Sequence, residues 1–149
     1  MSNRPDDTHG ENKQLVRDVF AAVDGHEFDR LHEFMAADFV CHMVGYPESM
    51  DREGTIEFIR AAYEIFPDFT HELQDVVADG NQVMVRLMNH TTHSKDFEGL
   101  PPTGKPIDYA SAHLLRIENG AIMEWWLLED NFGFLSQLGM TMKPADEGT

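Results

Sequence analysis

The stretch IDYASAHLLRIENGAIMEWWLL, residues 107–128, carries the clearest structural signal in the chain. Asn119-Gly120 is the dipeptide preferred in two-residue hairpin turns, and the segments 107–117 and 121–128 on either side have the composition of strands. We therefore predict an antiparallel hairpin here. Because successive side chains of a strand point to opposite faces, one face of the first strand carries Ile107, Tyr109, Ser111, His113 and Leu115.

The sequence before this hairpin predicts a second one. Residues 69–77 alternate with a period of two, Asp79-Gly80-Asn81 has turn chemistry, and apolar residues alternate again over 83–87. A compact apolar run at 38–44 suits a further short strand.

Helical periodicity dominates the first half of the chain. Apolar residues recur at steps of three and four over 15–23, 28–35 and 56–66, and Asp51 is placed to cap the third helix, which Pro67 ends. Another short helix is expected over 131–138. We expect a single domain over residues 1–149, with loose tails at 1–10 and 143–149, where no periodicity is visible.

This order of elements predicts an α+β fold. Three N-terminal helices followed by an antiparallel meander can bury their apolar faces only against one side of the sheet. A strongly curved sheet covered in this way is cone-shaped and leaves a conical cavity between helices and strands. We expect the functional site in that cavity.

Charge limits the classes of partner. The chain has 27 acidic and 11 basic residues and a formal net charge of −16, so neither nucleic acid nor a membrane surface is an expected partner. Such an excess is typical of proteins adapted to a salt-rich cytosol, where screening weakens self-repulsion. We expect a cytoplasmic protein, because residues 1–12 lack a signal-peptide pattern and no apolar run approaches about 18 residues.

Two motifs that would indicate a bound cofactor fail on inspection. Residues 99–105, GLPPTGK, have the spacing of a phosphate-binding loop, but Pro106 stands where Ser or Thr would hold magnesium, and a strand follows. Among the eight histidines, His90 and His93 are three apart on a predicted strand and so point to opposite faces. No metal and no cofactor are expected.

Several segments resemble the SnoaL-like polyketide cyclase family, which has the nuclear-transport-factor-like fold. They are residues 11–16 (ENKQLV), 37–42 (ADFVCH), 66–69 (FPDF), 99–105 (GLPPTGK), 116–120 (RIENG) and 137–139 (QLG). Together they span nearly the whole chain, and the Pro-Pro-Thr-Gly loop with the Asn-Gly hairpin is the most specific part.

The resemblance implies a cofactor-free cyclase that closes a ring of a polyketide by an intramolecular aldol step. Such chemistry needs a base for a C–H between carbonyls and a group that stabilises the enolate. The resemblance implies that His113 matches the family's catalytic histidine, whereas Leu127 occupies the position of its catalytic aspartate and cannot accept a proton. Asp130 and His42 are the candidate helpers of His113, although Asp130 can equally cap the helix that begins near Asn131.

We expect a small hydrophobic ligand or substrate to contact further residues of the cavity. Strand alternation and helical periodicity direct to it Tyr63, Phe66, Tyr109, Ser111, Trp125 and Leu127.

Two other functions are compatible with such a cavity. With Leu127 in place of the aspartate, the protein could be a non-catalytic binder or carrier of a small apolar ligand. A cofactor-independent hydroxylase or an epoxide hydrolase-like enzyme is the other alternative, drawn from relatives of the fold. A homodimer is expected through the outer face of the sheet, where Met84, Met88 and Trp126 are apolar.

Overall fold

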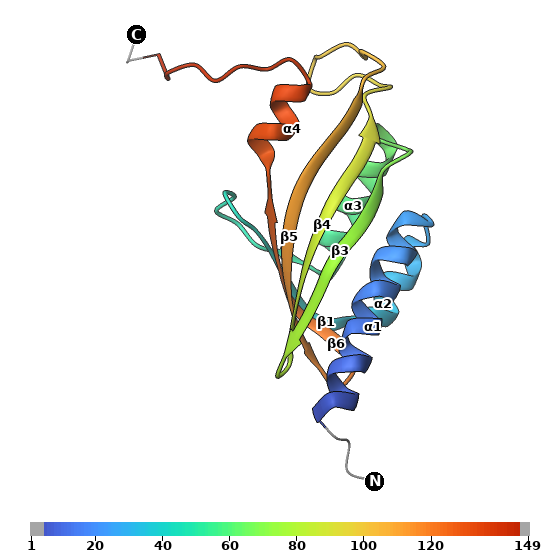
Figure 1. Ribbon diagram of the computed structural model, residues 1–149. Coiled ribbons are helices and arrows are strands. Elements are labelled where there is room, and N and C mark those ends of the chain that lie inside the picture. The colour runs from blue at the N-terminus through green and yellow to red at the C-terminus, as the bar shows by residue number, and fades with distance from the viewer. Residues whose placement is uncertain (1–4, 147–149) are drawn as a thin grey trace.

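The computed structural model describes residues 5–146 of the chain (Figure 1). Its elements are α1 (Pro5–Asp24), a 3-10 turn (Phe28–Arg30), α2 (Leu31–Phe34), β1 (Met35–Met43), β2 (Met50–Asp51), α3 (Arg52–Ile65), β3 (Thr70–Asp79), β4 (Gln82–Thr92), β5 (Pro106–Glu118), β6 (Ala121–Glu129) and α4 (Asn131–Gln137).

Both predicted hairpins form, and their turns have the expected backbone geometry. Asn119 and Gly120 have φ angles of 51° and 75°, the left-handed conformation that a two-residue turn of this kind requires. The β3–β4 turn uses Gly80 with a φ angle of 58°. These turns set the register of the sheet, in which His113 lies opposite Leu127 and Ser111 opposite Glu129.

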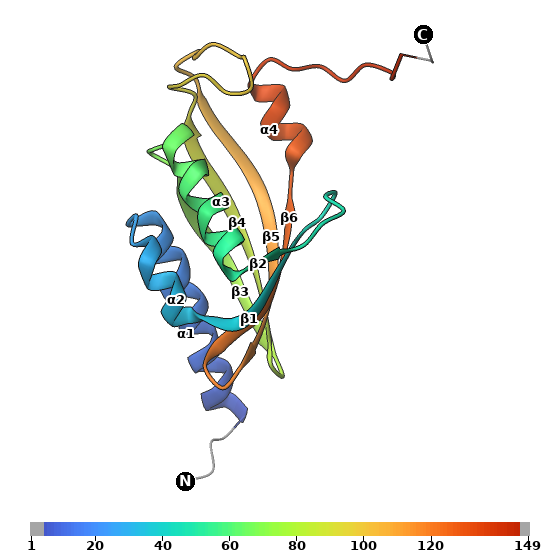
Figure 2. The same cartoon turned by 180° about the vertical axis from the view of Figure 1, so that it is seen from behind.

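The six strands form one curved sheet in the order β2-β1-β6-β5-β4-β3. Figures 1 and 2 show α1, α2 and α3 on the same side of it, and the elements converge near the β3–β4 and β5–β6 turns and spread apart towards α4. This arrangement confirms the predicted α+β fold with three N-terminal helices on one face of the sheet.

The core lies between the helices and the concave face of the sheet. In β5 every second residue from Ile107 to Ile117 is buried, which confirms the predicted alternation. The part of the core nearest the β3–β4 turn is apolar and includes Val16 and Val19 of α1 with Val83 and Val85 of β4. A second, smaller cluster around Ile107, Tyr109 and Leu138 lies where α4 meets β5. Polar side chains of the concave face are found between these two clusters.

Three features of the fold differ from the expectations. The first helix begins at Pro5, so residues 5–10 are not a loose tail; residues 1–4 and 147–149 lie outside the described part of the chain. Its first turns lack apolar periodicity because they lie beside the hairpin turns rather than over the core. The short strand β2 has no clear sequence signal. Finally, β1 pairs with β6 in parallel rather than antiparallel, which is possible because a long connection separates them.

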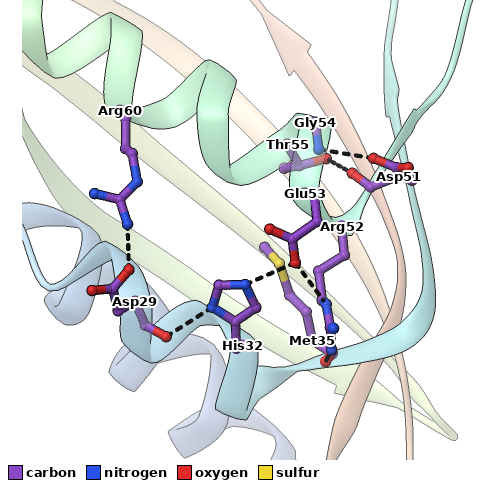
Figure 3. Close-up of polar contacts among 9 residues, drawn as sticks. All are labelled: Asp29, His32, Met35, Asp51, Arg52, Glu53, Gly54, Thr55 and Arg60. Carbon is purple, nitrogen blue, oxygen red and sulfur yellow. Dashed lines mark hydrogen bonds and ion pairs between the residues drawn. The ribbon is translucent and has the colours of Figure 1, made fainter.

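Polar contacts attach α3 to the segment that contains the 3-10 turn and α2 (Figure 3). The side chain of Asp51 caps α3 as predicted, because its Oδ1 accepts a hydrogen bond of 2.8 Å from the backbone N–H of Gly54. His32 lies between the carbonyl oxygen of Asp29, 3.0 Å from Nδ1, and a Glu53 carboxylate oxygen, 2.8 Å from Nε2. Arg60 of α3 pairs with Asp29.

We expect the contribution of His32 to stability to depend on pH. The hydrogen bond to the Asp29 carbonyl, followed by that to Glu53, raises the pKa of His32 above its usual value. The stabilisation is therefore present below the pKa of the unfolded chain and is lost as pH rises through the folded pKa. In urea unfolding, His32→Gln should destabilise the protein more at about pH 5.5 than at about pH 8.5. A difference of the opposite sign would contradict this account.

Candidate active site

Eight residues whose side chains carry polar groups form a cluster on the concave side of the sheet, which we call the inner polar cluster. Its members come from six elements: Asp24 of α1, Tyr63 of α3, His71 of β3, Asn89 of β4, Ser111 and His113 of β5, and Trp125 and Glu129 of β6. Sheet register explains why the strands bring these side chains together: His71 pairs with Asn89, and Ser111 pairs with Glu129.

His113 is held in one tautomer by its neighbours. Its ring is 2 % exposed, and its Nδ1 accepts a hydrogen bond of 2.9 Å from Trp125 Nε1. The indole N–H can only donate, so Nδ1 carries no proton and the hydrogen is on Nε2, which donates to Ser111 Oγ at 3.1 Å. Burial, with a smaller effect of the charge on His71, lowers the pKa of His113 to about 3. The imidazole is therefore a neutral hydrogen-bond donor at neutral pH.

Ser111 and Asn89 continue this chain of hydrogen bonds. Ser111 Oγ accepts from His113 and also from Asn89 Nδ2 at 3.0 Å, which uses both of its lone pairs and leaves its O–H proton free to donate. Asn89 Nδ2 also donates to the carbonyl oxygen of Tyr109 at 3.2 Å. The Oδ1 atom of Asn89 is buried and has no partner among the described residues. The pair thus has one donor and one acceptor that no other group among the described residues uses.

Glu129 adds a carboxylate to the same face. Its Oε1 lies 4.0 Å from His113 Nε2, and its side chain is 23 % exposed. Burial raises the pKa of this carboxyl, and the charge on His71 opposes the shift. A carboxylate with a raised pKa is a stronger base than an exposed one, which is the property that removal of a proton from carbon requires. Glu129 was not among the site residues expected from the sequence, although Glu129 follows Leu127 on the same face of the strand.

Asp24, His71 and Tyr63 form the other side of the cluster. Asp24 Oδ1 accepts from the Tyr63 hydroxyl at 2.8 Å and lies 2.7 Å from His71 Nδ1, and Oδ2 accepts from the backbone N–H of His71 at 2.9 Å. Burial acts to raise the pKa of Asp24, but the contacts with His71 and Tyr63 outweigh it and hold this pKa below its usual value. Asp24 is therefore an anion inside the protein. Neither it nor His71 was singled out as a site residue from the sequence.

The structure does not bring the two expected helpers of His113 to this cluster. His42 lies on the convex face, where its Nε2 is 2.6 Å from a Glu124 carboxylate oxygen and its ring stacks on Trp126. The parallel pairing of β1 with β6 is the reason, since it sets His42 beside Trp126 and Cys41 beside Trp125. Asp130 caps α4, with its Oδ1 accepting from the N–H of Gly133 at 2.9 Å.

The residues expected to contact substrate lie on the concave side but in two groups. Tyr63, Ser111 and Trp125 belong to the inner polar cluster, and Leu127 lies opposite His113 in the register. Phe66 and Tyr109 are found nearer α4, in the aromatic group described next.

Three phenylalanines form an aromatic cap at the α4 end of the sheet. Phe66 follows α3, Phe97 is in the loop between β4 and β5, and Phe134 is in α4, with ring centroids 5.5–5.7 Å apart. The ring of Tyr109 lies 5.0 Å from that of Phe134. The aromatic cap and Tyr109 thus make this end of the concave face apolar.

The most pronounced hollows on the surface of the described residues lie away from the inner polar cluster. An open groove of about 1220 Å³ lies at the opposite end, between the first turns of α1 and the hairpin turns, and is lined among others by His9, Asn12, Gly80 and Asn119. It contains none of the residues of the inner polar cluster. Within residues 5–146 no group of three or more His, Cys, Asp or Glu side chains is arranged to hold a metal ion, and no helix is long and apolar enough to cross a bilayer.

Comparison with known proteins identifies the family. The model of the SnoaL-like polyketide cyclases matches residues 13–138, which include every member of the inner polar cluster. The chain belongs to the SnoaL-like polyketide cyclase family. The resemblance seen in the sequence is thereby confirmed for this SnoaL-like protein.

Solved structures of similar fold agree with this assignment. IdmH from Streptomyces antibioticus, a candidate polyketide cyclase, is 31% identical, with a TM-score of 0.82 over 87% of this chain and 99% of that one. A SnoaL-like protein from Jannaschia sp. CCS1 is 20% identical, with a TM-score of 0.82 over 95% and 99% of the two chains. AclR from Streptomyces galilaeus, a candidate hydroxylase, is 22% identical, with a TM-score of 0.80 over 89% and 98%. The last two show the fold alone. No curated protein matches the chain.

The tautomer of His113 can be tested by removing the indole donor. Trp125→Phe should leave His113 Nδ1 as a buried acceptor without a partner, which costs about 1–3 kcal/mol of stability in urea unfolding. In ¹⁵N NMR the wild-type imidazole should carry its proton on Nε2, and the variant should show a mixture of tautomers. A wild-type spectrum with the proton on Nδ1 would contradict the assignment.

Proposed function

We propose that this SnoaL-like protein is an enzyme that acts on a small hydrophobic carbonyl compound by acid/base chemistry of the aldol type, without a cofactor. The observation that carries the proposal is the Glu129 carboxylate opposite Ser111 on the concave face, 4.0 Å from Nε2 of a neutral His113 that donates to Ser111. A base and an oxyanion donor side by side are the two groups that enolate formation needs.

Glu129, Ser111 and His113 have separate roles in this reaction. Glu129 takes the proton from a C–H between two carbonyl groups, and the enolate oxygen accepts a hydrogen bond from the Ser111 hydroxyl, whose oxygen in turn accepts from Nε2–H of His113. Glu129 thereby replaces the aspartate whose position Leu127 occupies. The role of His113 becomes that of a donor instead of the acid/base role expected from the sequence, because both nitrogens are already committed.

Hydrogen–deuterium exchange at carbon tests this function directly. Ethyl 2-methyl-3-oxobutanoate has one acidic C–H between two carbonyls, and its loss in D₂O is followed by ¹H NMR. We expect the wild-type protein to accelerate the exchange with saturation kinetics, and Glu124→Gln, on the convex face of the same strand, to retain the activity. Exchange at the buffer rate would overturn the proposal.

Leu127 supports a second candidate, a non-catalytic binder of an apolar ligand, because it makes the region opposite His113 apolar. The same experiment separates the two functions. A binder would be thermally stabilised by the ester in proportion to its occupancy and would leave the exchange rate unchanged.

We further propose that two chains associate through the convex face of the sheet. Val77, Met84 and Leu128 of this face are 61%, 50% and 54% exposed, and Trp126 lies beside them on β6. Apolar side chains in such number on one sheet face are typical of homodimer interfaces. Sedimentation at micromolar concentration should give a dimer for the wild type and a monomer for Leu128→Glu; a monomeric wild type would contradict the proposal.

A further inference from the structure

His71 has the surroundings of an oriented acid/base group, and the role of Glu129 leaves it unused. Its Nδ1 lies 2.7 Å from the carboxylate of Asp24, an acceptor, so Nδ1 carries a proton. The ring is 10 % exposed, and its Nε2 has no hydrogen-bond partner among the described residues. The Asp24 carboxylate thus fixes the orientation of the ring, and Nε2 is the nitrogen that remains available for proton transfer.

The rings of His71 and His113 lie on the same side of the sheet, next to the same side chain of α1. Phe20 of α1 packs against both imidazoles, with centroid distances of 5.0 Å to His71 and 5.5 Å to His113. In the sheet, His71 pairs with Asn89, whose side chain donates to Ser111. His71 and Glu129 therefore lie on two sides of the donor and acceptor that Ser111 and Asn89 present.

Two of the contacts that Asp24 makes here do not need the imidazole of His71. Asp24 attaches the end of α1 to β3 through the backbone N–H of residue 71, and it attaches α3 through the Tyr63 hydroxyl. Both contacts are independent of the side chain at position 71. The additional bond to Nδ1 stabilises the Asp24 anion and also fixes the orientation of the ring, which leaves Nε2 without a partner among the described residues.

We propose that His71, oriented by Asp24, is a second proton-transfer group that protonates the oxygen formed in the aldol step. The inference rests on the proposed function. Glu129 removes the C–H proton, and the electron pair of that bond becomes the enolate. The enolate carbon then attacks a second carbonyl carbon, a C–C bond forms, and the electron pair of the C=O bond moves to oxygen. The proton on Nε2 of the His71 imidazolium passes to that oxygen and leaves a neutral ring.

The reverse reaction separates the two proton transfers. The β-hydroxy ketone 4-hydroxy-4-(6-methoxynaphthalen-2-yl)butan-2-one releases a fluorescent aldehyde on retro-aldol cleavage. In this direction the neutral Nε2 of His71 accepts the hydroxyl proton, the C–C bond breaks, and the enolate formed is protonated by the Glu129 carboxyl. Exchange at carbon in the 3-oxo ester needs Glu129 but not His71.

We expect His71→Gln to lower the retro-aldol kcat by at least about 100-fold and to change the exchange rate by less than about threefold. Glu129→Gln should lower both rates. His90→Gln is the matched control. His90 lies on the convex face of β4, the strand next to β3, and contacts the carboxylates of Glu72 and Asp108. This variant should leave both rates unchanged.

A pH profile adds a readout that a structural role would not change. Charged and titratable groups around His71 are Asp24 of α1, Tyr63 of α3, His113 of β5 and Glu129 of β6. The pH dependence of the retro-aldol rate should therefore differ between the wild type and His71→Gln, because the variant lacks one of the two proton-transfer groups.

Each outcome bears on one of the two proposals. If the wild type accelerates exchange but not cleavage, or if His71→Gln reduces both rates equally and leaves the pH dependence of cleavage unchanged, the role of His71 is overturned and the proposed function stands. If the wild type accelerates neither reaction, the proposed function fails, and the role of His71 fails with it.

Discussion

Glu129→Gln is expected to slow deuterium exchange of the 3-oxo ester by about 10²–10⁴-fold, the usual contribution of a positioned general base. The amide keeps the shape of the side chain but cannot accept the proton. The activity of the wild type should rise with pH as the carboxyl ionises, and because burial raises its pKa this rise should lie above the range of an exposed glutamate. NMR exchange rates between about pH 4 and pH 8 measure both effects.

Stability measurements distinguish this loss from unfolding. A carboxyl whose folded pKa is raised stabilises the fold below the unfolded pKa, and this stabilisation is lost as pH rises through the folded value. At neutral pH the ionised Glu129 therefore lowers the free energy of unfolding. Glu129→Gln should be at least as stable as the wild type in urea. A variant that is stable and retains wild-type exchange would rule out Glu129 as the base.

Ser111→Ala is expected to have the second-largest effect, a loss of about 10²–10³-fold in the same exchange rate. The substitution removes the O–H that is free to donate to the enolate oxygen. It also leaves Nε2–H of His113 and Nδ2–H of Asn89 without their shared acceptor, which should cost about 1–3 kcal/mol in urea unfolding.

The effect of Ser111→Ala should fall on kcat rather than on KM, because the enolate oxygen carries its charge only as the proton leaves. Ser136→Ala is the matched control, since Ser136 is exposed on α4. An unchanged kcat for Ser111→Ala, in a variant that remains folded, would show that the serine does not contact the reacting oxygen.

The local elements of this protein follow from its sequence. A strand has a period of two residues, so the positions of Tyr109, Ser111 and His113 on one buried face could be predicted from their spacing. The turn at Asn119-Gly120 and the helix caps at Asp51 and Asp130 depend on contacts within four residues, and the structure has all of them. Family membership follows from the same local segments.

Partners that are distant in sequence could not be predicted in this way. The direction in which β1 joins β6 is set by the packing of the whole sheet, and it puts His42 on the convex face. Asp24 and His71 are 47 residues apart, and only the packing of α1 against β3 brings them to 2.7 Å. The raised pKa of Glu129 likewise results from burial by other elements.

Apart from β2 and the first turns of α1, the sequence by itself therefore determined the strands and helices, the hairpin turns and the side chains that share a face, because backbone periodicity and turn geometry act over a few residues. Only the tertiary structure decided which tautomer His113 adopts, which carboxylate lies beside it and which histidine faces it. These properties depend on hydrogen bonds and burial between elements that the chain brings together only when it folds.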